Sequence, residues 1–154
     1  MGRNILGVGI LFVAFLFGLL QYFKHADITS LTQFSLCGYI RSYLDFSAPE
    51  HELTGYELSL FFTIFVLLQF WNMFNAKGFE TRHSVFKDWH GCREFFLILL
   101  VIAVGQVLIV EFGGAVFRTV PLSWGEWAAV IGSTSLIAIG GEVVRTLGRR
   151  RRAR

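Results

Sequence analysis

The chain has 154 residues, and its 14 Lys and Arg against 11 Asp and Glu give a formal net charge of only +3. Its composition is 54% hydrophobic and 16% charged, with only two prolines, which is far more apolar than an ordinary soluble domain. This composition argues against a soluble domain and predicts insertion into a membrane.

Four apolar runs of about 16 to 21 residues each divide the chain. As a helix, such a run approaches or matches a hydrocarbon core of roughly 30 Å, because each residue adds about 1.5 Å. We therefore predict an all-α, polytopic membrane protein in which four transmembrane helices form a bundle. The whole chain is treated as one membrane domain with a basic tail at 145–154, and the expected spans are residues 5–23, 58–74, 95–110 and 124–144.

The first run could also be the core of a secretory signal, because Arg3 precedes it. It is longer than a typical signal core, and residues 21–27 offer no clear small-x-small cleavage site, so we expect a membrane span. The loop that follows, 24–56, is too long for a tight turn. Apolar residues recur in it at helical spacing, which predicts a short interfacial helix around residues 31–44.

The second run contains three amide side chains, Gln69, Asn72 and Asn75, which lipid cannot supply with hydrogen-bond partners. At about 100° per residue, Gln69 and Asn72 share one helical face, and Asn75 lies about 60° away from Asn72. We expect this face to point into the bundle. Interhelical hydrogen bonds are the expected use of the amides, with Asn75 also helping to end the helix.

The connector between the second and third runs, residues 78–94, mixes charged and aromatic residues. Such a mixture indicates a segment that lies against a membrane or a partner domain. The connector contains His83, His90 and Cys92, but it lacks a second paired metal-binding motif. A solvated loop is therefore favoured over a zinc site.

Each of the last two runs contains one polar residue of interest. Gln106, near the middle of the third run, is expected to form an interhelical hydrogen bond. The third run is expected to end where Gly113 follows Phe112. Glu142, near the end of the fourth, can form an ion pair with Arg145 three residues later; a proton or regulatory contact is the alternative.

The distribution of Lys and Arg predicts the orientation. They are concentrated before the first run, in the 78–94 connector and in the tail, so the positive-inside rule places both termini in the cytoplasm. Cys37 and Cys92 then lie on opposite sides of the membrane and cannot pair within one chain. The tail is expected to bind anionic lipid rather than nucleic acid, through the cluster Arg149, Arg150, Arg151 and Arg152.

No motif of a soluble enzyme is present: the chain contains no G-x-x-x-x-G-K, no G-x-S-x-G and no H-E-x-x-H. Five other stretches follow one another along the chain: RNILG, FVLLQFWNMFNAK, HSVFKDW, VLIVEFGGAVF and LSWGEWAAVIGSTSLIAIGGEVVR. Together they resemble membrane helices seven to ten of calcium-transporting P-type ATPases, especially the plasma-membrane type. The resemblance is strong over residues 58–147 and weak over the outer loop. It implies cytoplasmic termini and a location in the cell membrane, plasma or inner.

The resemblance implies a specific role for Gln69. This residue matches the position at which two-site calcium pumps of the sarcoplasmic reticulum type carry a glutamate ligand and the plasma-membrane type carries glutamine. An amide oxygen can bind calcium but adds no charge, so the resemblance implies a place in the calcium pathway and one transported calcium per cycle. Asn72 and Asn75 match the same motif, with packing against the transport helices as the expected role, and Glu142 matches a polar position in the last helix.

Other parts of the family pattern are absent from this chain, which lacks the D-K-T-G-T phosphorylation signature, the T-G-E loop and a nucleotide-binding domain. We therefore expect no catalysis and no cofactor in this segment, while the missing domains would use ATP and magnesium to transport calcium. The expected function is a support domain that packs against the transport helices of a longer pump and anchors them. The alternative is an independent four-helix scaffold or regulator derived from a pump, which the opening Met1 leaves open.

Overall fold

The computed structural model describes the backbone of residues 2–42, 51–81 and 93–152, and the side chains of residues 9–42, 51–77, 93–136 and 139–140. Helices are the only regular elements in this part of the chain, which confirms the all-α prediction there. Each of the four predicted spans falls inside one long helix. The elements are α1 (Gly2–His25), the 3₁₀ turn η1 (Leu31–Gln33), α2 (Leu36–Ser42), α3 (Gly55–Thr81), α4 (Arg93–Phe112), α5 (Gly114–Phe117) and α6 (Trp124–Arg152).

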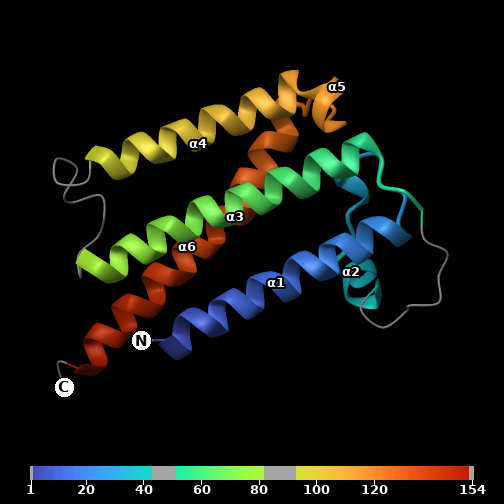
Figure 1. The fold of residues 1–154 in the computed structure, drawn as a ribbon. Coiled ribbons are helices and arrows are strands. Elements are labelled where there is room, and N and C mark those ends of the chain that lie inside the picture. Colours follow the sequence, from blue (N-terminus) through green and yellow to red (C-terminus); the bar gives the residue numbers. More distant parts are fainter. Residues whose placement is uncertain (1, 43–50, 82–92, 153–154) are drawn as a thin grey trace.

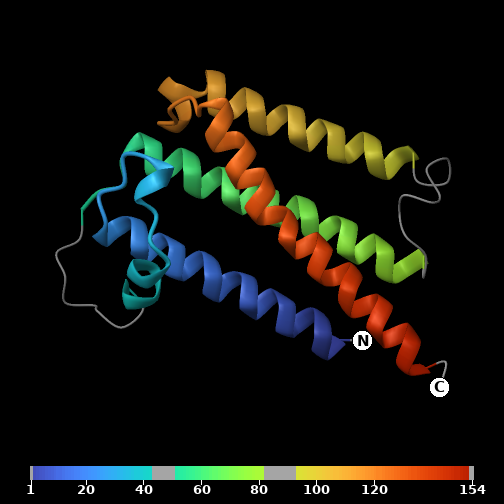
Figure 2. The same cartoon turned by 180° about the vertical axis from the view of Figure 1, so that it is seen from behind.

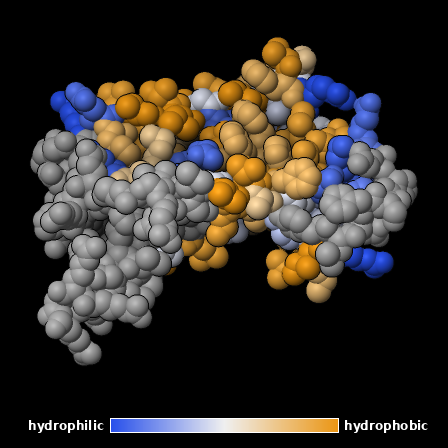
Figure 3. Space-filling model, turned by 60° about the horizontal axis from the view of Figure 1, so that its bottom comes forward, coloured by the Kyte–Doolittle hydropathy of each residue, from blue (hydrophilic) through white to orange (hydrophobic). Residues whose placement is uncertain are grey.

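Two helical segments, Gly55–Lys77 and Arg93–Phe112, are long and apolar enough to cross a membrane by length and composition. The described part of α1 contributes a shorter apolar segment, Gly9–His25. Exposed apolar side chains are also frequent on α1 and α4, as on Leu11 and Leu100, which are 70% and 64% exposed. Figure 3 shows hydrophobic side chains across the middle of the visible face, with most hydrophilic ones toward its two ends.

The long helices lie around α3, which contacts α1, α4 and α6 (Figure 1). The view from behind shows α6 crossing α3 obliquely (Figure 2). The start of α1, the end of α3, the start of α4 and the end of α6 all lie at one end of the molecule, which we call the terminal end. The short elements α2 and α5 lie at the opposite end, which we call the loop end.

The buried core is concentrated at the loop end. There the last turns of α1 meet the first turns of α3 and α6, and the residues between α1 and α2 close over them. Tyr22 links α1 to this loop, because its hydroxyl accepts the Ser35 N–H at 3.0 Å and its ring packs edge-on against Phe34. The core cluster consists of Leu19, Tyr22, Phe23, Ile28, Leu60, Val110, Leu122 and Val130.

A second apolar contact joins α3 to α4 near the terminal end. Phe74 of α3 packs edge-on against Phe95 and Phe96 of α4, with ring centroids 5.5 Å and 6.3 Å apart. Such aromatic pairs add about 0.5–1.5 kcal/mol beyond the area that they bury. This contact holds together two helices that adjoin the 82–92 connector.

The end of α4 follows from Gly113, as the sequence predicted. Its N–H donates to the carbonyl oxygen of Ile109 at 3.0 Å, and an added Cβ would lie only 2.3 Å from that oxygen. A side chain at this position would therefore collide with the last turn of the helix. The short α5 then ends at Phe117, and the residue that follows, Arg118, has a φ of 55° in the left-handed region.

Candidate functional site

One open stripe runs along α3. Over residues 55–77 the exposed side chains are Phe65, Gln69 and Ala76. Residues separated by four and seven positions lie on one helical face, so these three side chains form a single line. We call this line the α3 stripe. Every other side chain of α3 in this range is buried or half-buried, and the stripe is therefore the one face of 55–77 that the described residues leave open.

The prediction that the amide face points into this bundle is wrong for Gln69. Its neighbour Leu68 is 1% exposed and faces the other helices, whereas the Gln69 side chain is exposed. Because successive residues turn about 100° around the axis, the two cannot face the same neighbour. Asn72 and Asn75 are half-buried, so the three amides do not share one environment. Calcium binding by Gln69 stays a prediction.

Two hydrogen bonds join α3 to its neighbours inside the bundle. Gln106, 4% exposed, donates from Nε2 to Thr63 Oγ1 at 3.2 Å, which confirms the predicted interhelical bond. Trp71 donates from Nε1 to Thr134 Oγ1 of α6 at 3.0 Å, a contact that the sequence analysis missed. Both bonds satisfy polar groups inside an apolar structure and restrict how α3 can slide against α4 and α6.

The short helix expected around residues 31–44 is present over Leu36–Ser42, directly after η1. Several other predictions fall on parts of the chain that the structure does not describe. The zinc alternative at His83, His90 and Cys92 lies outside the described residues. For α6 the backbone is described, but the side chains of these residues are not: Glu142, Arg145, Arg149, Arg150, Arg151 and Arg152.

A buried carboxylate organises the loop end. Glu57, in the first turn of α3, is fully buried. Its Oε1 accepts the Ile28 N–H at 2.9 Å, and its Oε2 accepts both the N–H and the hydroxyl of Thr54 at 2.9 Å and 3.0 Å. The carboxylate therefore caps α3 and also ties it to the segment that follows α1. A negative charge is favoured here because the N-terminus of a helix carries a partial positive charge.

The loop end contains a second carboxylate of the same kind. Glu126, in the first turn of α6, accepts the N–H and the hydroxyl of Ser123 at 2.8 Å and 2.7 Å. It also accepts a short hydrogen bond from the Tyr56 hydroxyl, which connects α6 to α3. On the same side, Trp127 donates from Nε1 to Glu111 Oε1 at 3.0 Å. Of the two tryptophans of this turn, only Trp124 is fully exposed.

The sequence contained a signal for both carboxylates that we did not use. Thr54 with Glu57, and Ser123 with Glu126, have the spacing of a capping box, in which a hydroxyl residue precedes a glutamate by three positions. The motif marks the first turns of α3 and α6. In both, the glutamate side chain accepts the N–H of the hydroxyl residue, and the hydroxyl oxygen accepts the N–H of the glutamate. It does not indicate the further contact from Glu57 to Ile28, which joins residues 29 positions apart.

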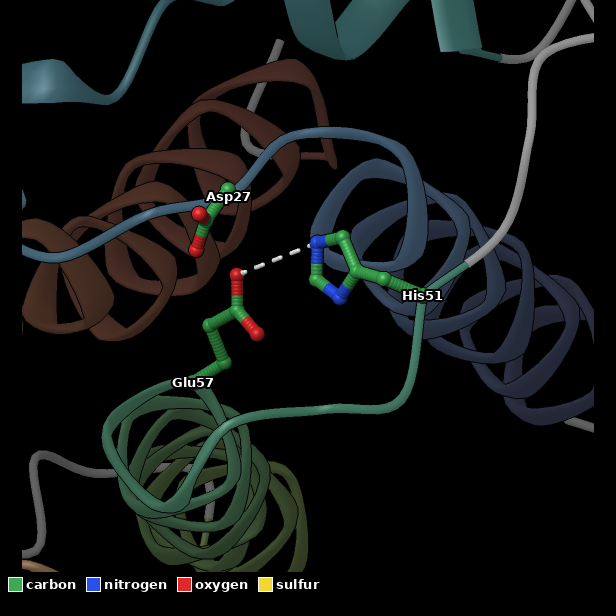
Figure 4. Close-up of side chains that lie close together, drawn as sticks. All are labelled: Asp27, His51 and Glu57. Atoms are coloured by element: carbon green, nitrogen blue, oxygen red, sulfur yellow. Dashed lines mark ion pairs between the residues drawn. The ribbon is translucent and has the colours of Figure 1, made fainter.

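Three potential metal ligands meet beside Glu57 (Figure 4). Asp27 follows α1, His51 precedes α3, and one ligand atom from each of the three residues lies within 4.8 Å of the others. His51 Nε2 is 3.8 Å from Glu57 Oε1, and its Nδ1 is 2.9 Å from the carbonyl oxygen of Glu52. The hydrogen bond to that carbonyl raises the pKa of His51 above its usual value, desolvation opposes this rise, and the charge of Glu57 adds to it.

Comparison with known proteins identifies relatives of this chain. Residues 1–147 match the family described as "Cation transporting ATPase, C-terminus". A plasma membrane calcium-transporting ATPase, mca-1, of Caenorhabditis elegans is 33% identical over 102 residues, which cover 65% of this chain and 8% of that protein. Calcium-transporting ATPase 4, plasma membrane-type, of Arabidopsis thaliana is 40% identical over 81 residues, which cover 51% of this chain and 8% of that protein. No solved structure matches the chain.

Proposed function

Because the chain belongs to the family of C-terminal domains of cation-transporting P-type ATPases, we propose that it is the membrane support domain of an ATP-driven calcium pump. The two relatives described above are both named calcium-transporting, and the matched segment makes up 8% of each. In this proposal the remaining membrane helices and cytoplasmic domains of the pump, with ATP and magnesium, carry out the transport.

The observation that carries the proposal is the α3 stripe. Its exposed amide, Gln69, lies among apolar side chains on a helix that is long and apolar enough to cross a membrane. An amide without a hydrogen-bond partner in hydrocarbon costs several kcal/mol. Lipid is therefore a poor neighbour for this face. A protein helix that supplies a polar partner suits it better, and we assign the face to the missing transport helices.

In this arrangement Gln69 lies next to the calcium pathway, and its amide oxygen can act as a neutral calcium ligand. Asn72, which lies along the stripe, and Asn75, which lies to one side of it, are half-buried and serve packing against the transport helices. From their i, i+3 spacing in the sequence, we also propose an ion pair between Glu142 and Arg145.

A chimaeric pump tests the assignment. The corresponding segment of the Arabidopsis relative is replaced by this chain, and ATP-driven calcium uptake into vesicles is measured. We expect uptake, and we expect Gln69→Leu to lower the calcium affinity or the rate of uptake. Val104→Ala is the matched control, because Val104 is exposed on α4, away from the stripe. Equal behaviour of the two variants would contradict the role of Gln69. An inactive chimaera with a stably folded isolated chain would favour the independent scaffold or regulator.

The proposed orientation has both termini in the cytoplasm of a plasma or inner membrane, with four spans. It is supported by the gathering of four helix ends at the terminal end (Figure 1). The two cysteines allow a direct test, since the described one, Cys37, is exposed at the loop end. An impermeant maleimide should label Cys37 in sealed cells, and Cys92 only after permeabilisation. The Cys92→Ser variant, which keeps only Cys37, reports on the loop end, and the Cys37→Ser variant, which keeps only Cys92, reports on the 78–94 connector. If Cys92 were labelled in sealed cells and Cys37 only after permeabilisation, the proposed orientation would be wrong.

The arginine cluster of the tail is proposed to bind anionic lipid. Each basic residue near an anionic membrane surface contributes about 1 kcal/mol, so four of them form a substantial electrostatic anchor. Replacing Arg149, Arg150, Arg151 and Arg152 with Gln should lower the ratio of phosphatidylserine to phosphatidylcholine in the lipid that copurifies with the chain in detergent. An unchanged ratio would show that the cluster does not bind anionic lipid.

A further inference from the structure

The three potential ligands at the loop end, Asp27, His51 and Glu57, come from separate segments. Asp27 lies just after α1, Glu57 belongs to the first turn of α3, and His51 lies in the segment between them (Figure 4). The His51 backbone is also held, because its N–H donates to the Lys24 carbonyl oxygen at 3.0 Å. The fold therefore brings together three side chains that local sequence does not place side by side.

The ring of His51 is oriented as in a metal ligand. A carbonyl oxygen can only accept, so Nδ1, 2.9 Å from the Glu52 carbonyl oxygen, must carry a proton and donate it. In the neutral ring the lone pair then lies on Nε2, which points toward Glu57. Histidines that bind metals are commonly fixed in this way, with the other ring nitrogen donating to a backbone carbonyl.

His51 Nε2 is shielded from solvent and has no hydrogen-bond partner in the part of the chain that the structure describes. Its 3.8 Å separation from Glu57 Oε1 is too long for a hydrogen bond. A lone pair that faces a carboxylate across this gap is electrostatically unfavourable unless a cation lies between the two atoms. That cation can be a proton on Nε2 or a metal ion.

The geometry is suited to a metal ion after a small adjustment. At a tetrahedral zinc ion, bonds of about 2.0–2.1 Å place two ligand atoms roughly 3.4 Å apart. The 3.8 Å gap between His51 Nε2 and Glu57 Oε1 therefore has to close by only a few tenths of an ångström. The carboxylate of Glu57 is already held in place by its hydrogen bonds to Ile28 and Thr54. Asp27 is exposed, and rotation of its side chain can bring a carboxylate oxygen closer as a third ligand.

We propose that Asp27, His51 and Glu57 bind one divalent transition-metal ion of the zinc class at the loop end. One nitrogen and two carboxylate oxygens suit zinc, whereas calcium takes six to eight oxygen ligands and does not favour imidazole. The site is separate from the α3 stripe and does not depend on the pump assignment. Bound metal cross-links the end of α1 to the start of α3 and stabilises the connection between them.

Zinc binding by the complete chain tests the proposal. The chain, without a histidine tag, is purified in detergent, treated with EDTA and titrated with zinc chloride in a calorimeter. We expect one zinc ion per chain and at least a ten-fold loss of affinity in His51→Ala and in Asp27→Asn. Asp27 is exposed, so this variant should fold normally, which circular dichroism checks. The buried Glu57 is left intact because its replacement also removes a helix cap.

A variant that combines His83→Ala, His90→Ala and Cys92→Ser is the matched control. It removes the ligands of the alternative zinc site in the 78–94 connector and should bind zinc as the parent does. An excess of calcium should not displace the zinc. The proposal is overturned if the parent binds no zinc, if both loop-end variants bind it with unchanged affinity, or if calcium competes.

Discussion

The buried carboxylate of Glu57 provides the sharpest test of how the loop end is held together. Glu57→Gln keeps the size of the side chain but replaces one carboxylate oxygen with an NH₂ group. Both oxygens accept a backbone N–H, one from Ile28 and the other from Thr54. Whichever way the amide is turned, its NH₂ group therefore faces one of these N–H groups, and that N–H loses its acceptor.

The expected cost follows from these contacts. A buried donor without a partner costs about 1–3 kcal/mol. Loss of a negative charge at a helix N-terminus adds about 0.3–1 kcal/mol. The Glu57→Gln variant should therefore lose about 1.3–4 kcal/mol of unfolding free energy. Glu126→Gln is the matched control, because it changes the same capping motif at a site that is only half-buried, where water can replace the lost acceptor. It should cost about 0.5–1 kcal/mol.

Both variants are unfolded by denaturant in detergent micelles, with EDTA present so that bound metal does not contribute. Hydrogen exchange at the amides of Ile28 and Thr54 provides the local measurement, and at least one of these amides should lose protection in Glu57→Gln. If Glu57→Gln is no less stable than Glu126→Gln, and both amides keep their protection, the account of the loop end given above is wrong.

Three further changes test the contacts of α3, α4 and α2. Gln106→Leu and Thr63→Val are combined in a double-mutant cycle, and stability is measured by unfolding in micelles. The coupling energy should be about 0.6 kcal/mol and at most about 1.7 kcal/mol, and a value of zero would refute the hydrogen bond. Gly113→Ala should destabilise the chain by about 1–3 kcal/mol, because the added Cβ meets the Ile109 carbonyl oxygen; a neutral effect on the melting temperature would contradict this. Tyr39→Phe removes a 2.9 Å hydrogen bond to a backbone carbonyl of α1, and should cost about 0.5–1.5 kcal/mol and increase proteolysis near α2; unchanged proteolysis and stability would count against it.

The sequence alone determined the helices and the family. The long apolar runs predicted α1, α3, α4 and α6. Apolar side chains must be buried or face lipid, and an apolar run of this length is typical of a helix that spans a membrane. The sequence also predicted the end of α4 at Gly113. A Cβ atom at this position would lie 2.3 Å from the Ile109 carbonyl oxygen, so the backbone can take this path only with glycine. The hydrogen bond of Gln106 could be expected as well, because an amide in an apolar helix requires a partner.

Only the tertiary structure decided which neighbour each face of a helix meets. Helical periodicity gives the angle of Gln69 relative to Leu68, but not which of these faces the other helices cover, and the amide proved to be exposed. The cluster of Asp27, His51 and Glu57 was equally invisible in the sequence, because its members lie up to 30 positions apart and meet only where the loop folds over α3. Contacts of this kind depend on how the segments pack, and no local pattern of residues records that packing.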